Sequence, residues 1–161
     1  MIRPRFTHPP GARLAALLAT LALYACGPSF HAALPAGFVE LEDQETYDWR
    51  ATTADGFVMA VREIEHEPKG PIEFWARAIE NQVRTRGGYA LIESREVTSA
   101  DGAKGKLMRF GHDEGGKPHM YLVAVYVTDD DLYLLEAGGT RDLYERHKAQ
   151  IDWALRNFRT N

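Results

Sequence analysis

Two histidines that flank a Gly-Gly pair have the types and spacing best suited to chemistry. If Gly115-Gly116 forms a two-residue β-turn, His112 lies directly opposite His119 on the neighbouring strand. Directly opposed residues share one face of a sheet at about 5 Å. Two imidazoles at that distance could bind Zn²⁺ or Cu²⁺ weakly, or repel each other when protonated near about pH 6. The sequence offers no third ligand, so two polar residues at a solvated hairpin end remain the alternative.

Glu136 is the second candidate for chemistry, because it lies within an apolar strand sequence. A buried carboxylate there could have a raised pKa and act as an acid or base. The alternative is an ion pair with an arginine, for which Arg109 and Arg141 are available. A hydrolase or metal-dependent enzyme would need His112, His119 and Glu136 to converge in one pocket.

The remaining polar clusters favour structural roles. Asp129 to Asp131 lack the alternating spacing of a calcium loop and are expected to form a solvated turn. No serine lies in a Gly-x-Ser-x-Gly elbow, and Gly87-Gly88 lies between a helix and a strand, the wrong order for a phosphate-binding loop. We therefore expect no cofactor and favour a non-catalytic protein.

Three aromatic residues near one hairpin are candidate anchors for a binding surface. Tyr47, Trp49 and Phe57 lie on or beside two predicted strands. Large aromatic side chains are enriched at protein interfaces. Packing in the core explains each of them as well.

Length and charge restrict the class of protein. The chain has 161 residues, 45% of them apolar and 26% charged, which predicts one globular domain. Residues 1–25 carry Arg3, Arg5 and Arg13 and no acid. Without them Lys+Arg falls from 19 to 16 against 23 Asp+Glu, so the net charge changes from −4 to −7. An acidic domain without a basic stripe is not expected to bind nucleic acid.

The amino terminus has the layout of an export signal. A positive segment precedes an apolar run from Leu14 to Leu23, which is too short to span a bilayer. The run ends in Leu23-Tyr24-Ala25-Cys26, and Cys26 is the only cysteine. These residues resemble the lipobox of bacterial lipoproteins, which implies signal cleavage between Ala25 and Cys26 and lipid on Cys26. The alternative is an ordinary secretory signal followed by a chance cysteine.

The resemblance to lipoproteins sets the expected organisation and location. Residues 1–25 are the signal peptide, 26–36 a lipidated tether and 37–161 a single domain. Two or three acyl chains, including palmitate, would anchor the protein stably to a membrane of the cell envelope. Gly27 after the cysteine, in place of Asp, implies the outer membrane facing the periplasm in enteric-type bacteria.

Alternation, turns and helical periodicity predict an α+β domain. An antiparallel sheet of six to seven strands is expected, with helices packed on it as an α/β/α sandwich. In the Asp55-Gly56 hairpin, a two-residue turn would place Trp49 opposite Arg62 as a cation–π pair. Gly138-Gly139 is expected to end the last strand. Strands are expected at 38–42, 46–53, 57–64, 89–98, 104–112, 119–128 and 132–137, and helices after Gly70-Pro71 and after Thr140.

Together these elements resemble the PsbP/Mog-type fold. The resemblance covers roughly residues 37–159 and rests on the Asp55-Gly56 hairpin, Phe74-Trp75 after a Gly-Pro start, Gly88-Tyr89, and Glu136-Ala137-Gly138-Gly139. The group includes an extrinsic photosystem II subunit, a Ran-binding import factor and envelope lipoproteins of the DcrB kind. It implies a non-catalytic binding or assembly module whose partner is an envelope protein or a small ligand. No functional residue of the family maps onto this sequence.

Overall fold

The structure is a computed structural model that describes residues 29–42 and 46–160. Within them lie seven strands and three helices. The strands are β1 (Phe38–Glu40), β2 (Trp49–Thr53), β3 (Val58–Glu65), β4 (Ala90–Thr98), β5 (Lys104–Glu114), β6 (Lys117–Val127) and β7 (Asp131–Thr140). The helices are α1 (Ile72–Gly87), α2 (Arg141–Arg146) and α3 (Lys148–Asn157).

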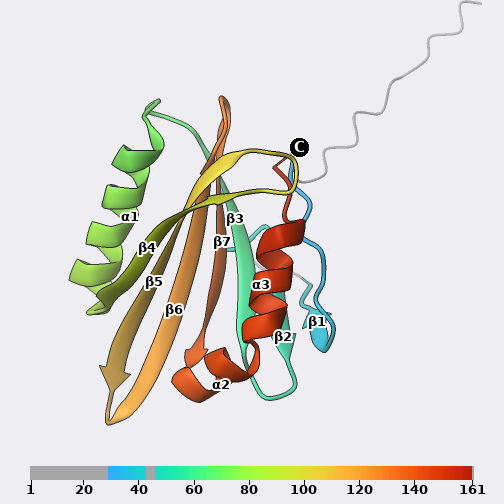
Figure 1. The fold of residues 1–161 in the computed structure, drawn as a ribbon, viewed down its shortest axis with the longest axis vertical. Coiled ribbons are helices and arrows are strands. Elements are labelled where there is room, and N and C mark those ends of the chain that lie inside the picture. Colours follow the sequence, from blue (N-terminus) through green and yellow to red (C-terminus); the bar gives the residue numbers. More distant parts are fainter. Residues whose placement is uncertain (1–28, 43–45, 161) are drawn as a thin grey trace, which may run out of the picture.

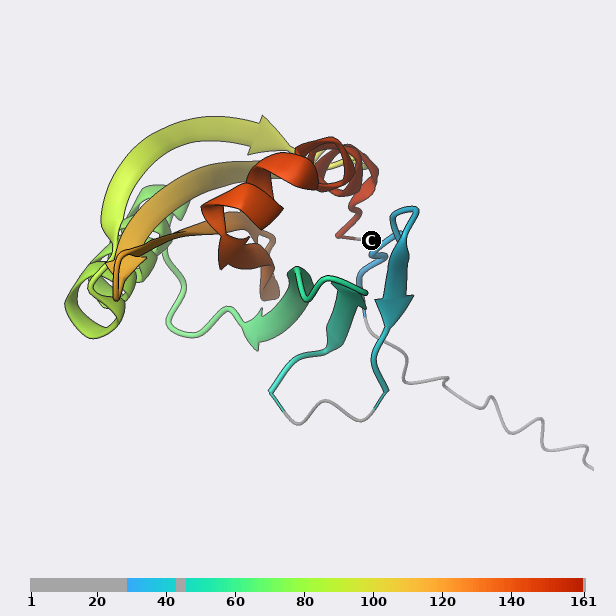
Figure 2. The same ribbon diagram turned by 90° about the horizontal axis from the view of Figure 1, so that it is seen from below.

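The strands form one antiparallel sheet with helices on both faces, which confirms the predicted fold class. The strand order is β1-β2-β3-β7-β6-β5-β4. Helix α1 lies on one face, and α2 and α3 lie on the other (Figure 1). Seen along the strands, the sheet curls around the side that holds α2 and α3, so α1 is on its convex side (Figure 2).

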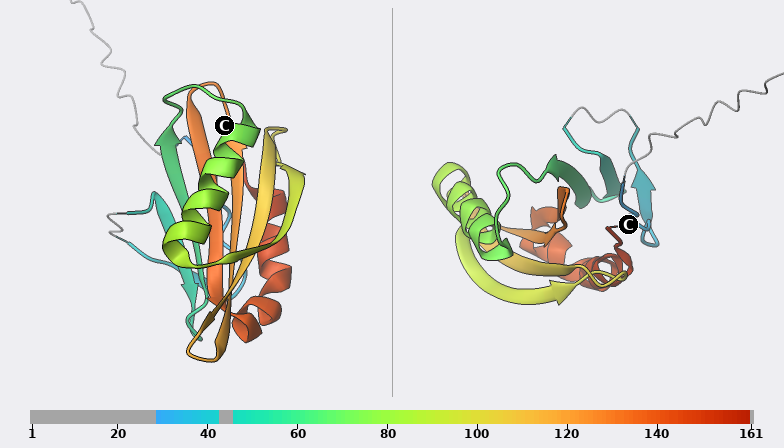
Figure 3. Two further views of the ribbon diagram at one scale, coloured as in Figure 1. Left: turned by 90° about the vertical axis from the view of Figure 1, so that its left-hand side faces the viewer. Right: turned by 90° about the horizontal axis from the view of Figure 1, so that it is seen from above.

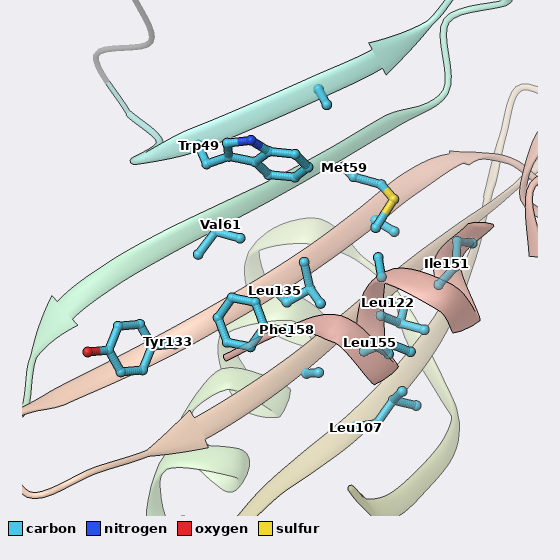
Figure 4. Packing of buried hydrophobic residues seen from close by; sticks show 14 of the residues in the cluster. Trp49, Met59, Val61, Leu107, Leu122, Tyr133, Leu135, Ile151, Leu155 and Phe158 are labelled. Atoms are coloured by element: carbon cyan, nitrogen blue, oxygen red, sulfur yellow. The ribbon is translucent and has the colours of Figure 1, made fainter. Parts of the chain in front are cut away.

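Strand β6 is covered on both faces, as its continuous apolar sequence predicts. Leu122, Ala124 and Tyr126 belong to the larger core under α2 and α3. Val123 and Val125 belong to the smaller core under α1. Figure 4 shows how residues of β2, β3 and β7 meet those of α3 in the larger core.

The β5–β6 hairpin has the predicted two-residue turn. Gly115 and Gly116 have φ values of 61° and 79°, as expected for a type I′ turn. His112 therefore pairs with His119.

The β2–β3 hairpin corrects the predicted register. Thr53 N–H donates to the carbonyl of Phe57 at 3.0 Å, so the loop has three residues instead of two. Trp49 consequently pairs with Val61, and Arg62 moves to the opposite face of the sheet. The predicted cation–π pair between Trp49 and Arg62 is wrong for this reason.

Gly138 and Gly139 do not end the sheet, contrary to the prediction. They continue β7 to Thr140 and pair with Tyr121 and Met120. A Cβ atom on Gly139 would lie 2.9 Å from the ring of Phe57. Glycine is therefore used here for close packing instead of chain reversal.

The helices follow the predicted boundaries with one difference. Helix α1 ends at Gly87 and is capped by Gly88, whose φ of 67° is the left-handed conformation that suits glycine. Thr140 caps α2 by accepting a hydrogen bond from Leu143 N–H at 3.4 Å. The closing helix is divided at His147 into α2 and α3, whereas periodicity alone predicts one continuous helix.

The domain begins earlier than the expected boundary at residue 37. Phe30 is buried and stacks on Phe158 with 6.0 Å between ring centroids. His31 exchanges two backbone hydrogen bonds with Arg159, at 3.0 and 3.1 Å. Part of the expected tether is therefore packed on the fold. Within the described residues, no helix is long and apolar enough to cross a membrane.

The two edges of the sheet differ in length. Strand β1 has three residues, whereas β4 has nine. The pairing of β4 with β5 shifts between Leu91 and Glu93. Strand β4 exposes side chains of both positive and negative charge, together with Ile92.

Candidate binding site on the open sheet face

The convex face of the sheet is only partly covered by α1. The helix contacts β4, β5 and β6 and leaves β2, β3 and the adjoining end of β7 without a helix (Figure 3). We call this region the open face. A shallow groove of about 250 Å³ lies on it, lined by Tyr47, Arg50, Val58, Ala60, Tyr121 and Glu136.

A buried carboxylate lies at the floor of this groove. Glu136 is only 5% exposed, although it lies next to the solvated open face. Its Oε1 forms an ion pair with Arg62 Nη2 and accepts a hydrogen bond from the Tyr121 hydroxyl at 2.8 Å. The three side chains come from β7, β3 and β6. The prediction that Glu136 meets an arginine is confirmed, but that arginine is Arg62 instead of Arg109 or Arg141.

The partners of Glu136 have shifted proton affinities. Burial alone would lower the pKa of Arg62, but the hydrogen bond to Glu136 and its negative charge raise that pKa overall. Burial and the charge of Glu136 raise the pKa of Tyr121. Arg62 is therefore a cation and Tyr121 a neutral donor at physiological pH. Both groups direct a hydrogen at the same carboxylate oxygen, Glu136 Oε1.

Tyr47 lies over the two guanidinium groups of the groove. Its ring centroid is 5.5 Å from Arg50 Cζ and 6.0 Å from Arg62 Cζ, both within cation–π range. The sequence prediction paired the wrong aromatic residue with arginine, because the three-residue loop moves Arg62 to the face that Tyr47 covers. The resulting surface combines an aromatic ring with cations.

The structure corrects two of the three predicted surface anchors. Phe57 is fully buried and Trp49 is 9% exposed, and both belong to the larger core. Core packing, the alternative that the sequence left open, explains both. Tyr47 is half-buried and alone lines the groove.

The predicted histidine pair lies on the same face of the sheet, nearer the tip of the β5–β6 hairpin than Tyr121. His112 Nδ1 is 3.1 Å from the carbonyl of Gly88, and His119 Nδ1 is 2.9 Å from that of Lys117. The ring of His112 also packs on Tyr89, at 5.0 Å between centroids. The described residues contain no group of three or more side chains that could hold a metal ion. Weak binding by the pair alone stays a prediction.

The three residues required for a hydrolase do not converge. His119 pairs with Thr140, which is four residues along β7 from Glu136. Four residues of a strand span about 13 Å, which is too far for a shared catalytic site. Glu136 instead forms hydrogen bonds with Arg62 and Tyr121.

A second polar cluster, which the sequence reasoning missed, joins the β2–β3 hairpin to the closing helices. Asp55 Oδ2 accepts a hydrogen bond from Arg146 Nη1 at 2.6 Å, and Oδ1 lies 3.0 Å from His147 Nε2. Hydrogen bonds from Thr53, Arg146 and His147 lower the pKa of Asp55, although partial burial opposes them. His147 also stacks on Phe57 at 5.3 Å. His147 therefore lies at the boundary of the core, between Phe57 and the exposed Asp55 carboxylate.

The predicted lipidation and cleavage residues, Ala25 and Cys26, lie outside the described residues. The described arrangement is an open groove that combines an aromatic ring, a half-buried arginine and a buried carboxylate. Its titratable groups are engaged with one another instead of being directed at a reacting atom.

Comparison with known proteins identifies the fold. No family model and no curated protein matches the sequence. The solution structure of cyanobacterial PsbP (CyanoP) from Synechocystis sp. PCC 6803 is similar, with a TM-score of 0.62 and 13% identity over 81% of this chain and 85% of that chain. LpqN of Mycobacterium tuberculosis, described as involved in cell envelope biogenesis, has a TM-score of 0.68 and 9% identity over 81% and 83%.

These likenesses hold over nearly the whole of each compared structure, while identity is too low to carry over a function. Both TM-scores are above 0.6, which shows that the arrangement of the elements is shared. The described part of this chain therefore has a PsbP-like fold.

Proposed function

We propose that this protein is a lipid-anchored module of the bacterial cell envelope that binds a partner protein without catalysing a reaction. The open face is the binding surface, and the groove over Glu136 is its centre. The observation that carries the proposal is the uncovered part of the sheet, with Tyr47 over Arg50 and Arg62. Aromatic and arginine side chains are the types most enriched at protein interfaces.

The shape of the groove favours a protein partner over a small ligand. Its volume of about 250 Å³ is below the range of roughly 300–1,000 Å³ that is usual for small-molecule sites. It is also shallow and open to solvent. An extended segment or a loop of another protein would cover such a surface more fully.

The envelope location is supported by the lipobox-like sequence at Cys26 and by the shared fold with LpqN, an envelope-biogenesis protein. A non-catalytic role is supported by the engagement of Glu136 with Arg62 and Tyr121. The observations that support the envelope location are independent of those that support the non-catalytic role. The anchor and the binding surface can therefore be tested separately.

The test is site-specific photo-cross-linking in native membranes. A photoreactive amino acid replaces Val58, which lines the groove, or Val39, which is 65% exposed on β1 and serves as the control. We expect one recurrent envelope protein to be captured from position 58 and not from position 39. Tyr47→Ala should reduce this capture, because it removes the ring that covers Arg62.

The same mass spectra report the mass of the peptide that begins at Cys26. Equal capture from both positions, or capture unaffected by Tyr47→Ala, would contradict the proposed surface. An unmodified or uncleaved amino terminus would contradict the proposed anchor. If no protein is captured specifically from position 58, a small ligand becomes the favoured occupant of the groove.

A further inference from the structure

A second exposed apolar surface lies on the opposite side of the sheet, on α3. Leu34 is 44% exposed and Trp153 is 39% exposed. With Pro35, Ala36, Ala149 and Gln150 they line a shallow hollow of about 490 Å³. We call these six residues the α3 patch. Nothing in the proposed binding surface requires them.

The α3 patch lies close to the point where the chain enters the fold. Phe30 stacks on Phe158, and His31 pairs with Arg159, so residues 29–31 lie beside the carboxyl end of α3 (Figure 1). Trp153 is four residues before the last residue of that helix, which is about 6 Å along its axis. Ala149 and Gln150 lie about one turn further from that end, so the patch runs along α3 from near the entry point towards the start of the helix.

The sequence places the expected anchor very close to that entry point. Cys26 is three residues before Ser29, and three residues span at most about 11 Å. Ser29 is itself held in the fold, since its hydroxyl donates to Glu63 Oε1 at 2.5 Å. A lipid on Cys26 would hold this end of the domain against the bilayer.

Helix α3 and the residues directly after it carry more exposed positive than negative charge, although the chain as a whole is acidic. Lys148, Arg156 and Arg159 are exposed on α3 and directly after it. Asp152 is the acidic residue of α3 itself. Cations near a membrane surface are attracted by anionic headgroups, and tryptophan is enriched at the level of the headgroups.

We propose that the α3 patch lies on the surface of the membrane that carries the anchor, with Trp153 and Leu34 among the lipid headgroups. The inference rests on the proposed function in one respect, which is the lipid on Cys26. It adds an orientation: α3 faces the bilayer, and the open face, on the other side of the sheet, faces away from it and remains accessible to a partner.

Fluorescence quenching by labelled lipids tests this orientation. The full lipidated chain is reconstituted in vesicles of equimolar phosphatidylcholine and phosphatidylglycerol, with or without lipids that carry a quencher near the headgroup. The chain has three tryptophans, of which Trp49 is in the core and Trp75 is on α1, across the sheet from the patch. We expect quenching in the native chain and in Trp75→Phe, and loss of quenching in Trp153→Phe.

Other outcomes separate this inference from the proposed function. If Cys26 carries lipid and the protein is on vesicles, but quenching is absent or persists in Trp153→Phe, the orientation is wrong and the anchor stands. If the mass shows no lipid on Cys26, both fail. Equal quenching in vesicles of phosphatidylcholine alone would overturn the contribution of Lys148, Arg156 and Arg159. Circular dichroism of each variant verifies that it is folded.

Discussion

At the scale of single residues, the stability of the open face depends on Glu136. Its carboxylate is buried, and its charge is balanced by Arg62 and a hydrogen bond from Tyr121. Removing one member of a buried pair leaves an uncompensated charge and costs about 3–5 kcal/mol. A third of the Arg62 side chain is exposed, which reduces this cost because solvent screens the charge.

We therefore expect Arg62→Met to lower the free energy of unfolding by about 2–3 kcal/mol in urea denaturation at neutral pH. Arg62→Met combined with Glu136→Gln should recover part of that loss, since no buried charge is left. The matched control is Arg84→Met, which removes an exposed pair with Glu80 (3.3 Å) and should cost less than about 0.5 kcal/mol. A similar loss in Arg62→Met and Arg84→Met would show that burial of Glu136 does not matter.

Two glycines in the sheet provide a contrast at the same scale. A Cβ atom on Gly105 would lie 2.5 Å from the buried ring of Tyr126 and 2.8 Å from the carbonyl of Val125. The neighbours of a Cβ atom on Gly138 would be at 3.7 Å, which is ordinary contact. We expect Gly105→Ala to cost about 1–3 kcal/mol through overpacking, and Gly138→Ala to be close to neutral. Thermal unfolding of both variants measures the difference, and equal melting temperatures would contradict it.

The turns determined which contacts between single residues could be predicted from the sequence. The two glycines at 115 and 116 identify their turn uniquely, so the pairing of His112 with His119 was predictable. Asp55-Gly56 fits loops of two or three residues, and one residue of difference exchanges the two faces of a strand. That ambiguity hid the ion pair between Arg62 and Glu136.

At the scale of elements, two hairpins of the same design hold the two ends of α3. Thr53-Ala54-Asp55-Gly56 and Ser99-Ala100-Asp101-Gly102 both form three-residue loops in which the hydroxyl donates to the aspartate. Asp55 contacts His147, just before α3. Asp101 Oδ2 accepts hydrogen bonds from Thr160 N–H (3.0 Å) and Oγ1 (2.8 Å), beyond the other end. The shared sequence pattern was visible, but its role depends on where the helix packs.

The hairpin aspartates predict a loss of stability in acid. Burial would raise the pKa of Asp101, but hydrogen bonds from Ser99 and Thr160 lower it overall. A carboxyl group whose pKa is lowered in the folded state stabilises that state above its unfolded pKa of about 3.9, and this contribution disappears as the pH falls below that value.

We expect Asp101→Asn to lower the free energy of unfolding by about 1 kcal/mol at neutral pH. The difference from the native chain should shrink as the pH falls from about 4 to about 2, because protonation removes the same interaction from the native chain. Urea titrations across this range measure it, with Glu40→Gln on exposed β1 as the control. A difference that stays constant with pH would contradict the role of the ionised carboxylate.

The order and type of the elements were predictable, while their ends were less so. Alternation and turn residues predicted the strands of the sheet, and Thr140 predicted the start of α2. Gly138-Gly139 was misread because glycine also permits close packing, which depends on the distant Phe57. The break at His147 was missed because Tyr144 and Ile151 keep the periodicity of one helix.

At the scale of the whole molecule, Phe30, near the start of the described residues, belongs to the core. Phe30 is 6% exposed and contacts Tyr133 and Phe158. Loss of a buried phenylalanine ring costs about 3–5 kcal/mol, so we expect Phe30→Ala to lower the free energy of unfolding by about 3 kcal/mol. Val39→Ala, at an exposed site on β1, should change it by less than about 0.5 kcal/mol. Urea denaturation compares the two, and similar small losses would mean that residues 29–31 are not part of the cooperative unit.

The architecture could be predicted because it depends on local patterns: hairpin turns, an apolar central strand and two amphipathic helices. The groove and the α3 patch could not, because each joins segments far apart in sequence. Tyr47 meets Arg62 only through the register of β2 and β3, and Leu34 meets Trp153 only when the first described residues pack on α3.

The edges of the sheet have a consequence for the lipid-anchored protein that we propose, many copies of which would share one membrane. Anchored molecules diffuse in two dimensions and collide often, so a free strand edge could join them into continuous ribbons. Strand β1 is too short to act as a template, and β4 presents Glu93, Arg95 and Glu96 together with a register shift. Addition of a neighbour's strand would place these charges in the joint between two molecules. We therefore expect both edges to resist polymerisation, which would keep copies of the proposed anchored protein separate in a crowded layer.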